Sequence, residues 1–316
     1  MPARPGRPSR RHELLAWALP RVRRTGELVD VAHERARVEE RQRTRRPGLP
    51  TALVPRFPRR FAVCRDDSAG YPTHVVTPRG GAAESAGAGG LTLLHVHGGG
   101  YSYPLDPFHL RWLCRLSAAT GARLVLPDHP LSPRHTWRDS HAATVALATR
   151  YAEGAAAAGG RLVLSGDSAG GGYALAVAQA MRDAGGAVAD RLLLVSPWVD
   201  LADTTPDETA AATAADPWLF VGKVRAHALW WAGSEEDLAR PEVSPVHGSL
   251  AGLPPALLLY GTRDTLAPGC RLLADRGLDA GWDLTVVEEP GLLHVYPLLP
   301  FVPEAARARR QVLEFL

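Results

Sequence analysis

The chain is short of cysteine and of lysine, and the shortage of cysteine excludes two kinds of site. Among 316 residues there are only three cysteines, an odd number at wide spacing. That pattern fits neither a disulfide framework nor a zinc site. Lysine is scarcer still, because Lys223 is the one lysine among 36 basic residues. We expect no metal and no structural disulfide. The cysteines are Cys64, Cys114 and Cys270.

Long hydrophobic runs are also absent. No segment approaches the roughly 20 apolar residues that a membrane-spanning helix needs, so no stable membrane insertion is expected. Near the N-terminus the apolar stretch from Leu14 to Leu19 ends at Pro20, and it is too short for the core of an export signal. A cytoplasmic protein is therefore the expectation.

The charge is small overall but unevenly spread. The formal net charge is +3, yet residues 1–60 carry 16 arginines against 6 acidic residues. A basic arm can bind nucleic acid or anionic lipid. We interpret this one as the solvated face of N-terminal helices and expect no nucleic-acid partner. With 46% hydrophobic and 22% charged residues, the composition is typical of a globular protein with one α/β core.

The most informative motif surrounds Ser168. The apolar segment Leu162–Leu164 predicts a buried strand, and a helix is predicted to begin after Gly170. Between them Gly166-Asp-Ser-Ala-Gly170 has the G-x-S-x-G pattern of a nucleophile elbow, a sharp turn that exposes a serine hydroxyl at a helix N-terminus. The two glycines are expected to permit that turn, since side chains beside the serine would clash.

A second glycine motif lies upstream. The predicted strand Leu91–His97 runs into Gly98, Gly99 and Gly100. Such a loop offers backbone N–H groups without side chains in the way, as the oxyanion of an acyl-transfer transition state requires. Together with the elbow, it predicts an oxyanion hole.

A base and its orienting acid should follow the serine in chain order. Asp264 comes directly after the predicted strand at 256–260, and His294 follows the predicted strand at 284–288. The carboxyl ends of parallel strands share one edge of a sheet, so Ser168, Asp264 and His294 are expected to converge. Other candidates are interpreted as structural: Asp167, Asp200 and Asp203 as loop braces, His97 as ordering the glycine loop, and His227 and His247 as surface or packing histidines.

These motifs together resemble the hormone-sensitive-lipase-like α/β-hydrolases, the bacterial family IV esterases, over roughly residues 61–316. Asp128–Pro133 and Ser196–Asp200 resemble two further segments of that family. The resemblance implies a serine carboxylesterase acting on short- to medium-chain esters through an acyl-enzyme. It also implies oxyanion donors on the Gly98–Gly100 loop and on Ala169, a small-molecule ester as substrate, and no cofactor. Three positions depart from the family pattern, at His129-Pro130, Arg134 and Pro268.

The predicted elements alternate between strand and helix after residue 90. This alternation indicates an α/β-hydrolase fold, a mostly parallel eight-stranded sheet with helices on both faces. Residues 1–60 are expected to form N-terminal cap helices broken at Pro20 and Gly26, and residues 61–316 the catalytic domain, with a cap insertion near 200–245. The Gly/Ala-rich stretch 79–90 reads as a mobile loop.

Substrate contacts and the outcome of the reaction stay open at this stage. Aromatic residues that could line a pocket are equally able to pack in the core. An acyl-enzyme is common to esterases, lactonases, amidases and acyltransferases, and a non-catalytic binding protein can share the fold. The last helix, near 303–316, could pack on the sheet or form a homodimer contact. The aromatic candidates are Tyr101, Tyr103, Trp218, Trp230 and Trp231.

Overall fold

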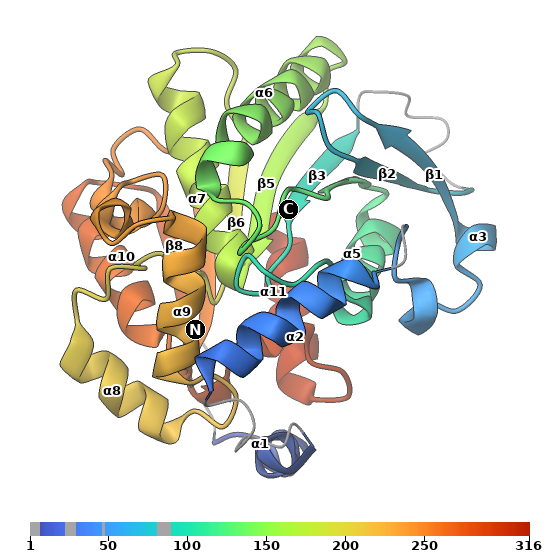
Figure 1. The fold of residues 1–316 in the computed structure, drawn as a ribbon. Helices are drawn as coiled ribbons and strands as arrows, with labels where there is room; N and C mark the ends of the chain where they lie inside the picture. Colours follow the sequence, from blue (N-terminus) through green and yellow to red (C-terminus); the bar gives the residue numbers. More distant parts are fainter. Residues whose placement is uncertain (1–6, 23–29, 46–47, 81–89) are drawn as a thin grey trace.

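The computed structural model describes residues 7–22, 30–45, 48–80 and 90–316. Its centre is one eight-stranded sheet in the order β1-β2-β4-β3-β5-β6-β7-β8 (Figure 1). β2 is antiparallel to both β1 and β4, and the remaining neighbours pair in parallel. The strands are β1 Phe61–Asp66, β2 Thr73–Pro78, β3 Leu91–Val96, β4 Arg123–Pro127, β5 Arg161–Asp167, β6 Arg191–Val195, β7 Ala256–Arg263 and β8 Leu284–Leu293.

Helices cover both faces of this sheet, as the sequence predicts. One hydrophobic core joins it to α6, α7 and α10, and a second core joins the opposite face to α5 and α11. The strands between these layers read as continuous apolar runs because both of their faces are buried; Leu162, Val163 and Leu164 of β5 are each at most 1% exposed. The helices are α5 Pro107–Thr120, α6 His141–Ala157, α7 Ser168–Asp183, α10 Ala267–Asp279 and α11 Pro303–Phe315.

In the described ranges, four longer α-helices and one short α-helix accompany those named above. α1 (Arg10–Val22) and α2 (Val31–Arg43) precede the sheet, while α8 (Pro206–Ala215) and α9 (Val221–Ala232) lie between β6 and β7. The short α3 (Phe57–Arg60) leads into β1. Figure 1 shows α2 crossing in front of the sheet with α9 beside it. α2 and α9 therefore lie at the end of the sheet where the loops that follow the parallel strands emerge.

Two sequence-based expectations need correction. Pro20 does not break the first helix, because α1 continues through it to Val22; the break expected at Gly26 lies outside the described residues, as does most of the Gly/Ala loop. β7 and β8 are longer than predicted, since their pairing continues through a register shift between Gly261 and Arg263. That extension carries each strand to the residue just before Asp264 or His294.

The last helix packs on the sheet. Val312 is fully buried, and Leu313, Phe315 and Leu316 pack against the core that α11 shares with α5. The homodimer contact stays a prediction.

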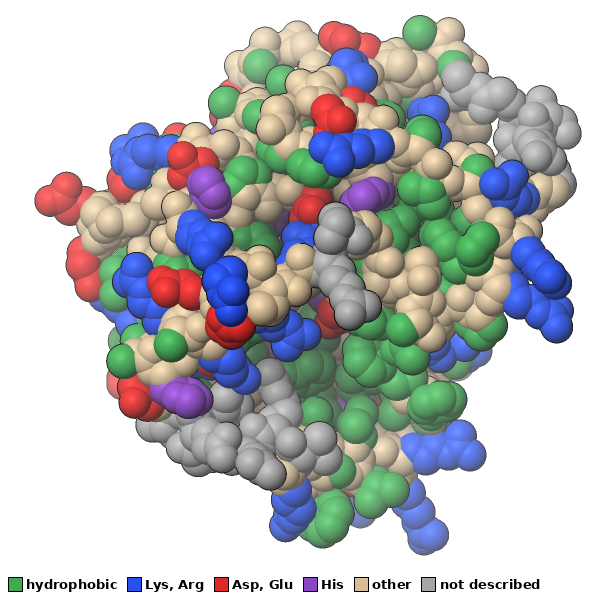
Figure 2. Space-filling model, turned by 45° about the vertical axis from the view of Figure 1, so that its right-hand side comes forward, with side chains coloured by type: hydrophobic (Ala, Val, Ile, Leu, Met, Phe, Trp, Pro, Cys, Tyr) green, Lys and Arg blue, Asp and Glu red, His purple; other side chains and the backbone are tan. Residues whose placement is uncertain are grey.

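The surface combines exposed apolar and basic side chains. Figure 2 shows hydrophobic side chains gathered on the lower half of one face, with Lys and Arg side chains projecting at its border. Leu14, Trp17 and Phe301 are among the large hydrophobic residues that are more than half exposed. No helix within the described ranges is long and apolar enough to cross a bilayer.

Candidate active site

Ser168 occupies a strained turn between β5 and α7. Its φ is +52°, a left-handed conformation that non-glycine residues rarely adopt. A Cβ at Gly166 would overlap the carbonyl of Gly170, and one at Gly170 would overlap the carbonyl of Val96. The turn therefore requires glycine at both positions, as expected, and it presents the serine hydroxyl at the N-terminus of α7.

A chain of hydrogen bonds links this hydroxyl to a buried carboxylate. His294 Nε2 lies 2.9 Å from Ser168 Oγ, and His294 Nδ1 lies 2.8 Å from Asp264 Oδ2. Asp264 is fully buried, and its second oxygen accepts the backbone N–H of Leu266 at 2.9 Å. The three residues expected to converge from separate strand ends thus lie within hydrogen-bonding distance.

The surroundings of His294 favour its charged form. Burial lowers the pKa of this imidazole, but the charge of Asp264 and the hydrogen bond to it outweigh burial, so the net effect raises the pKa above its ordinary value. Trp218 approaches the imidazole edge-on with ring centroids 5.9 Å apart. A proton taken from Ser168 would therefore reside on a base that the site stabilises when charged.

A second carboxylate, missed at the sequence level, lies close to this chain. Asp216 accepts the backbone N–H and the hydroxyl of Thr265 at 2.8 and 2.9 Å, beside Asp264. Burial and the charge of Asp264 raise its pKa. Asp216 comes from the loop between α8 and α9, so no local motif could have placed it against Thr265, which is 49 positions away in the chain.

The glycine loop lies against the nucleophile turn. Gly99 and Gly100 have φ of +113° and +59°. The Gly98 N–H already donates to Asp167 Oδ1 at 3.1 Å, so of the three expected donors it is the one that is engaged elsewhere. His97 Nδ1–H donates to the Gly98 carbonyl at 2.8 Å, which fits its expected role in ordering the loop.

Asp167 anchors this loop from below. Its carboxylate accepts from His95 Nε2 at 3.0 Å and from His109 Nε2 at 3.1 Å, in agreement with the structural role expected of it. Burial lowers the pKa of His109, but Asp167 and Asp106 together raise it to about 10. His109 and Asp167 thus form a pair of an imidazolium and a carboxylate, and this pair connects α5 to the turn beside Ser168. Neither His95 nor His109 was singled out from the sequence.

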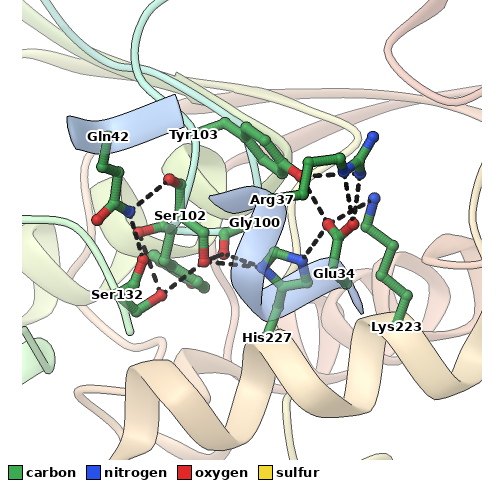
Figure 3. A network of polar contacts seen from close by, with 10 residues as sticks. Glu34, Arg37, Gln42, Gly100, Ser102, Tyr103, Ser132, Lys223 and His227 are labelled. Atoms are coloured by element: carbon green, nitrogen blue, oxygen red, sulfur yellow. Dashed lines mark hydrogen bonds and ion pairs between the residues drawn. The ribbon is translucent and has the colours of Figure 1, made fainter. Parts of the chain in front are cut away.

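Above the loop lies a polar network that joins α2 and α9 (Figure 3). Glu34 of α2 is 1% exposed. It accepts from Tyr103 Oη at 2.6 Å and His227 Nε2 at 3.1 Å, and it pairs with Lys223 Nζ at 2.8 Å and with Arg37. Burial raises the pKa of Glu34, but these donors more than offset it and hold the pKa well below its usual range. The carboxylate is therefore charged.

His227 is buried and packs against Trp230, in agreement with its interpretation as a packing histidine, and it also belongs to this network. Burial lowers its pKa. Its Nε2 lies 3.1 Å from Glu34, and its Nδ1 lies 2.8 Å from Ser102 Oγ and 3.1 Å from the Gly100 carbonyl oxygen. Gln42 of α2 adds bonds to the carbonyls of Ser102 and Ser132, at 2.8 and 2.7 Å. Helix α2 thus holds the loop that carries Gly99 and Gly100 in place. This contact is long-range, and no local sequence motif predicts it.

A cavity of about 450 Å³ opens above Ser168 and His294. Tyr103 and Trp218 line it, as suggested from the sequence. The other three aromatic candidates are not among its lining residues: Tyr101 stacks on Trp231 in the core with centroids 4.3 Å apart, and Trp230 packs against His227. Much of the wall is apolar and comes from α1, the loop before α9 and the segment after His294: Leu15, Leu19, Leu219, Phe220, Leu298, Leu299 and Pro300.

The remaining polar candidates have structural partners. Asp200 accepts the backbone N–H and the hydroxyl of Thr204 at 2.8 and 2.6 Å, which agrees with its expected role as a loop brace, and His247 lies 3.3 Å from it. His129, one of the departures from the family pattern, stacks on His97 with centroids 5.0 Å apart. Nowhere in the described ranges do three His, Cys, Asp or Glu side chains come together as a metal site.

Comparison with known proteins agrees with this architecture. The family described as alpha/beta hydrolase fold matches residues 93–298. An acetyl-hydrolase of Streptomyces hygroscopicus is 35% identical over 221 residues, covering 69% of this chain and 73% of that protein.

Two solved structures carry the likeness further. An esterase from the bacterial hormone-sensitive lipase family superposes with a TM-score of 0.72 at 26% identity, covering 90% of both chains. A hormone-sensitive lipase from a metagenome library gives 0.71 at 25% identity, covering 90% of this chain and 97% of that one. The chain therefore belongs to the alpha/beta-hydrolase-fold family, within its hormone-sensitive-lipase-like esterases, and is a carboxylic-ester hydrolase.

Proposed function

We propose that this hydrolase is a serine esterase in which Ser168, His294 and Asp264 form the catalytic triad. The observation that carries the proposal is the unbroken chain of two hydrogen bonds, 2.9 and 2.8 Å long, from Ser168 Oγ through His294 to Asp264. This is the arrangement that acyl transfer through a serine requires. Its position at the floor of the cavity gives an ester access to the hydroxyl.

Acylation begins when Ser168 Oγ attacks the ester carbonyl and His294 Nε2 takes its proton. Asp264 accepts from Nδ1–H, which holds the imidazole in the tautomer that leaves Nε2 free to act as base. The imidazolium then gives the proton to the departing alkoxide, which leaves as the alcohol. An acyl-enzyme on Ser168 remains.

Backbone N–H groups stabilise the negative charge on the carbonyl oxygen in both steps. We assign this role to Gly99, Gly100 and Ala169, because the N–H of Gly98 is already given to Asp167. Each such donor typically lowers the barrier by roughly 3–4 kcal/mol. Deacylation repeats the chemistry with water: His294 takes a proton from water, the hydroxide attacks the acyl carbonyl, and Ser168 leaves with the proton from His294.

The helices outside the sheet are proposed to form a cap. α1 and α2, from residues 1–60, precede the first strand, and α8 and α9, from the insertion near 200–245, lie between β6 and β7 in the chain. Leu15 and Leu19 of α1 and Lys223 of α9 contribute to the cavity wall. A cavity of about 450 Å³ is small among ligand pockets, which span roughly 300–1,000 Å³, so short to medium acyl chains are the proposed substrates.

The test is hydrolysis of p-nitrophenyl esters from acetate to palmitate by wild type, Ser168→Ala and Ser234→Ala. Loss of the nucleophile should lower kcat by about 10⁶-fold, whereas the exposed Ser234 serves as the matched control. A fluorophosphonate probe should label wild type once per chain and leave Ser168→Ala unlabelled. Equal turnover by Ser168→Ala and wild type would refute the triad, and rates that rise steadily to palmitate would refute the chain-length proposal.

A further inference from the structure

One end of the cavity is unusually rich in cationic side chains. Arg37 and Arg41 of α2 and Lys223 of α9 all line it, and all three surround the ring of Tyr103. Their charged groups lie 5.8, 5.7 and 5.6 Å from the ring centroid. A chain that has one lysine among 36 basic residues thus places that lysine in the wall of its active-site cavity.

Cationic side chains outnumber carboxylates among the described residues at this end. Glu34 is the described carboxylate that pairs with Lys223 and Arg37. Other carboxylates of the cavity wall are bound elsewhere: Asp106 and Asp167 both hold His109. Burial raises the pKa of the Tyr103 hydroxyl, and the bond to Glu34 raises it further, so the phenol adds no negative charge.

Arg41 differs from its two neighbours in its contacts. Among the described residues it has no ion pair with a carboxylate, and its guanidinium lies over the face of Tyr103. Its side chain is exposed and lines the cavity, so it can reach a ligand without giving up a partner. A planar guanidinium matches a carboxylate or phosphate with two parallel hydrogen bonds.

We propose that the cavity selects esters carrying an anionic group, a carboxylate or a phosphate, which Arg41 binds at the Tyr103 end within the positive field of Arg37 and Lys223. This inference rests on the proposed function, because it assigns a substrate class to the cavity of Ser168. Glu34 pairs with Arg37 and Lys223, and the substrate's anion pairs with Arg41.

The experiment compares pairs of esters that differ in one charge. Mono-(4-nitrophenyl) glutarate and 4-nitrophenyl valerate place a carboxylate or a methyl at the end of the same acyl chain. 4-Acetoxybenzoate and its methyl ester share the acetyl group and differ in charge on the phenol that leaves. For each pair the measured quantity is the ratio of kcat/KM for the anionic ester to that for the neutral ester, normalised to hydrolysis by hydroxide. Wild type should favour the anion by about tenfold in at least one pair.

Arg41→Gln should bring that ratio close to one, and Arg43→Gln should leave it unchanged. Arg43 lies on the same helix, is exposed and pairs with Glu40, so it controls for the loss of one positive charge. Added salt should reduce the preference, since exposed charges are screened. A ratio near one in both pairs for wild type, or equal ratios for the two variants, would overturn this inference while leaving the esterase intact. Failure of wild type to hydrolyse either neutral ester would instead count against the proposed function.

Discussion

Asp264→Asn tests how the buried carboxylate acts on His294. The change removes a charge while keeping the size of the side chain, and the oxygen of the new amide can still accept the N–H of Leu266 that Asp264 Oδ1 accepts now. His294 must be neutral to take the proton of Ser168. Its raised pKa therefore places the acid limb of the kcat/KM profile above the ordinary histidine pKa of about 6.5, with activity lost as the pH falls through the raised pKa.

The size of the effect follows from the contact. A hydrogen bond to a charged group, such as the 2.8 Å bond between His294 Nδ1 and Asp264, contributes about 1.5–3 kcal/mol. Burial lowers the pKa of His294, and Asp264 is the main group that offsets this effect. Once the charge of Asp264 is removed, the pKa of His294 should fall. The acid limb should move to lower pH by about one to two units. Because the imidazole also loses its orienting partner, kcat should fall by about 10⁴-fold.

The assay is a pH profile of p-nitrophenyl butyrate hydrolysis from about pH 4.5 to 9, a range that brackets the ordinary histidine pKa, with thermal melts to establish that the variant folds. Asp183→Asn, at an exposed carboxylate, is the control and should match wild type. Asp216→Asn should shift the limb in the same direction but less, since Asp216 acts on His294 through charge alone. A folded Asp264→Asn enzyme whose acid limb stays in place would refute the electrostatic reasoning.

Three further changes probe the scaffold. Gly170→Ala should destabilise the protein by more than about 3 kcal/mol, because the new Cβ overlaps backbone carbonyls. Gly154→Ala has open space inside α6 and should instead raise Tm by the equivalent of about 1 kcal/mol. Equal melting temperatures for the two variants would contradict both expectations. Leu164→Ala, at a fully buried position of β5, should lower the free energy of unfolding by about 2–5 kcal/mol, as measured by urea unfolding. Gln42→Ala leaves two loop carbonyls without their donor, so kcat should fall while KM changes little; unchanged kcat would show that the loop does not need α2.

Local patterns were sufficient for most of the sheet. The expected parallel strands were confirmed because a parallel strand between two helical layers is a short apolar run bounded by turn residues. The ends of β7 and β8 were misjudged, since Pro290 and Gly291 read as a loop but belong to β8, which pairs with β7 through an irregular register. Pro20 was misread as a helix break because packing of α1, where Ala16 is buried, outweighs the local penalty.

The site divides in the same way between local and long-range information. Ser168, Asp264 and His294 could be predicted because each follows a recognisable strand, and strand ends in a parallel sheet share one edge. Glu34, His227 and Asp216 could not, because Glu34 and His227 are partners 193 residues apart and Asp216 lies 49 residues from Thr265. For Tyr101 and Trp231 the sequence left pocket and core packing open, because aromatic composition does not say which way a ring packs, and both rings pack in the core.

The sequence by itself determined the sheet, the nucleophile turn and the order of the residues proposed for catalysis, since these depend on apolar periodicity and on glycine's freedom over a few adjacent positions. Only the tertiary structure decided which residues of α1, α2 and α9 line the cavity, that Gly98 gives its N–H to Asp167, and that three cations gather around Tyr103. Those features arise from helix packing across distant parts of the chain. No local spacing encodes that packing, because it depends on the shape of both partners at once.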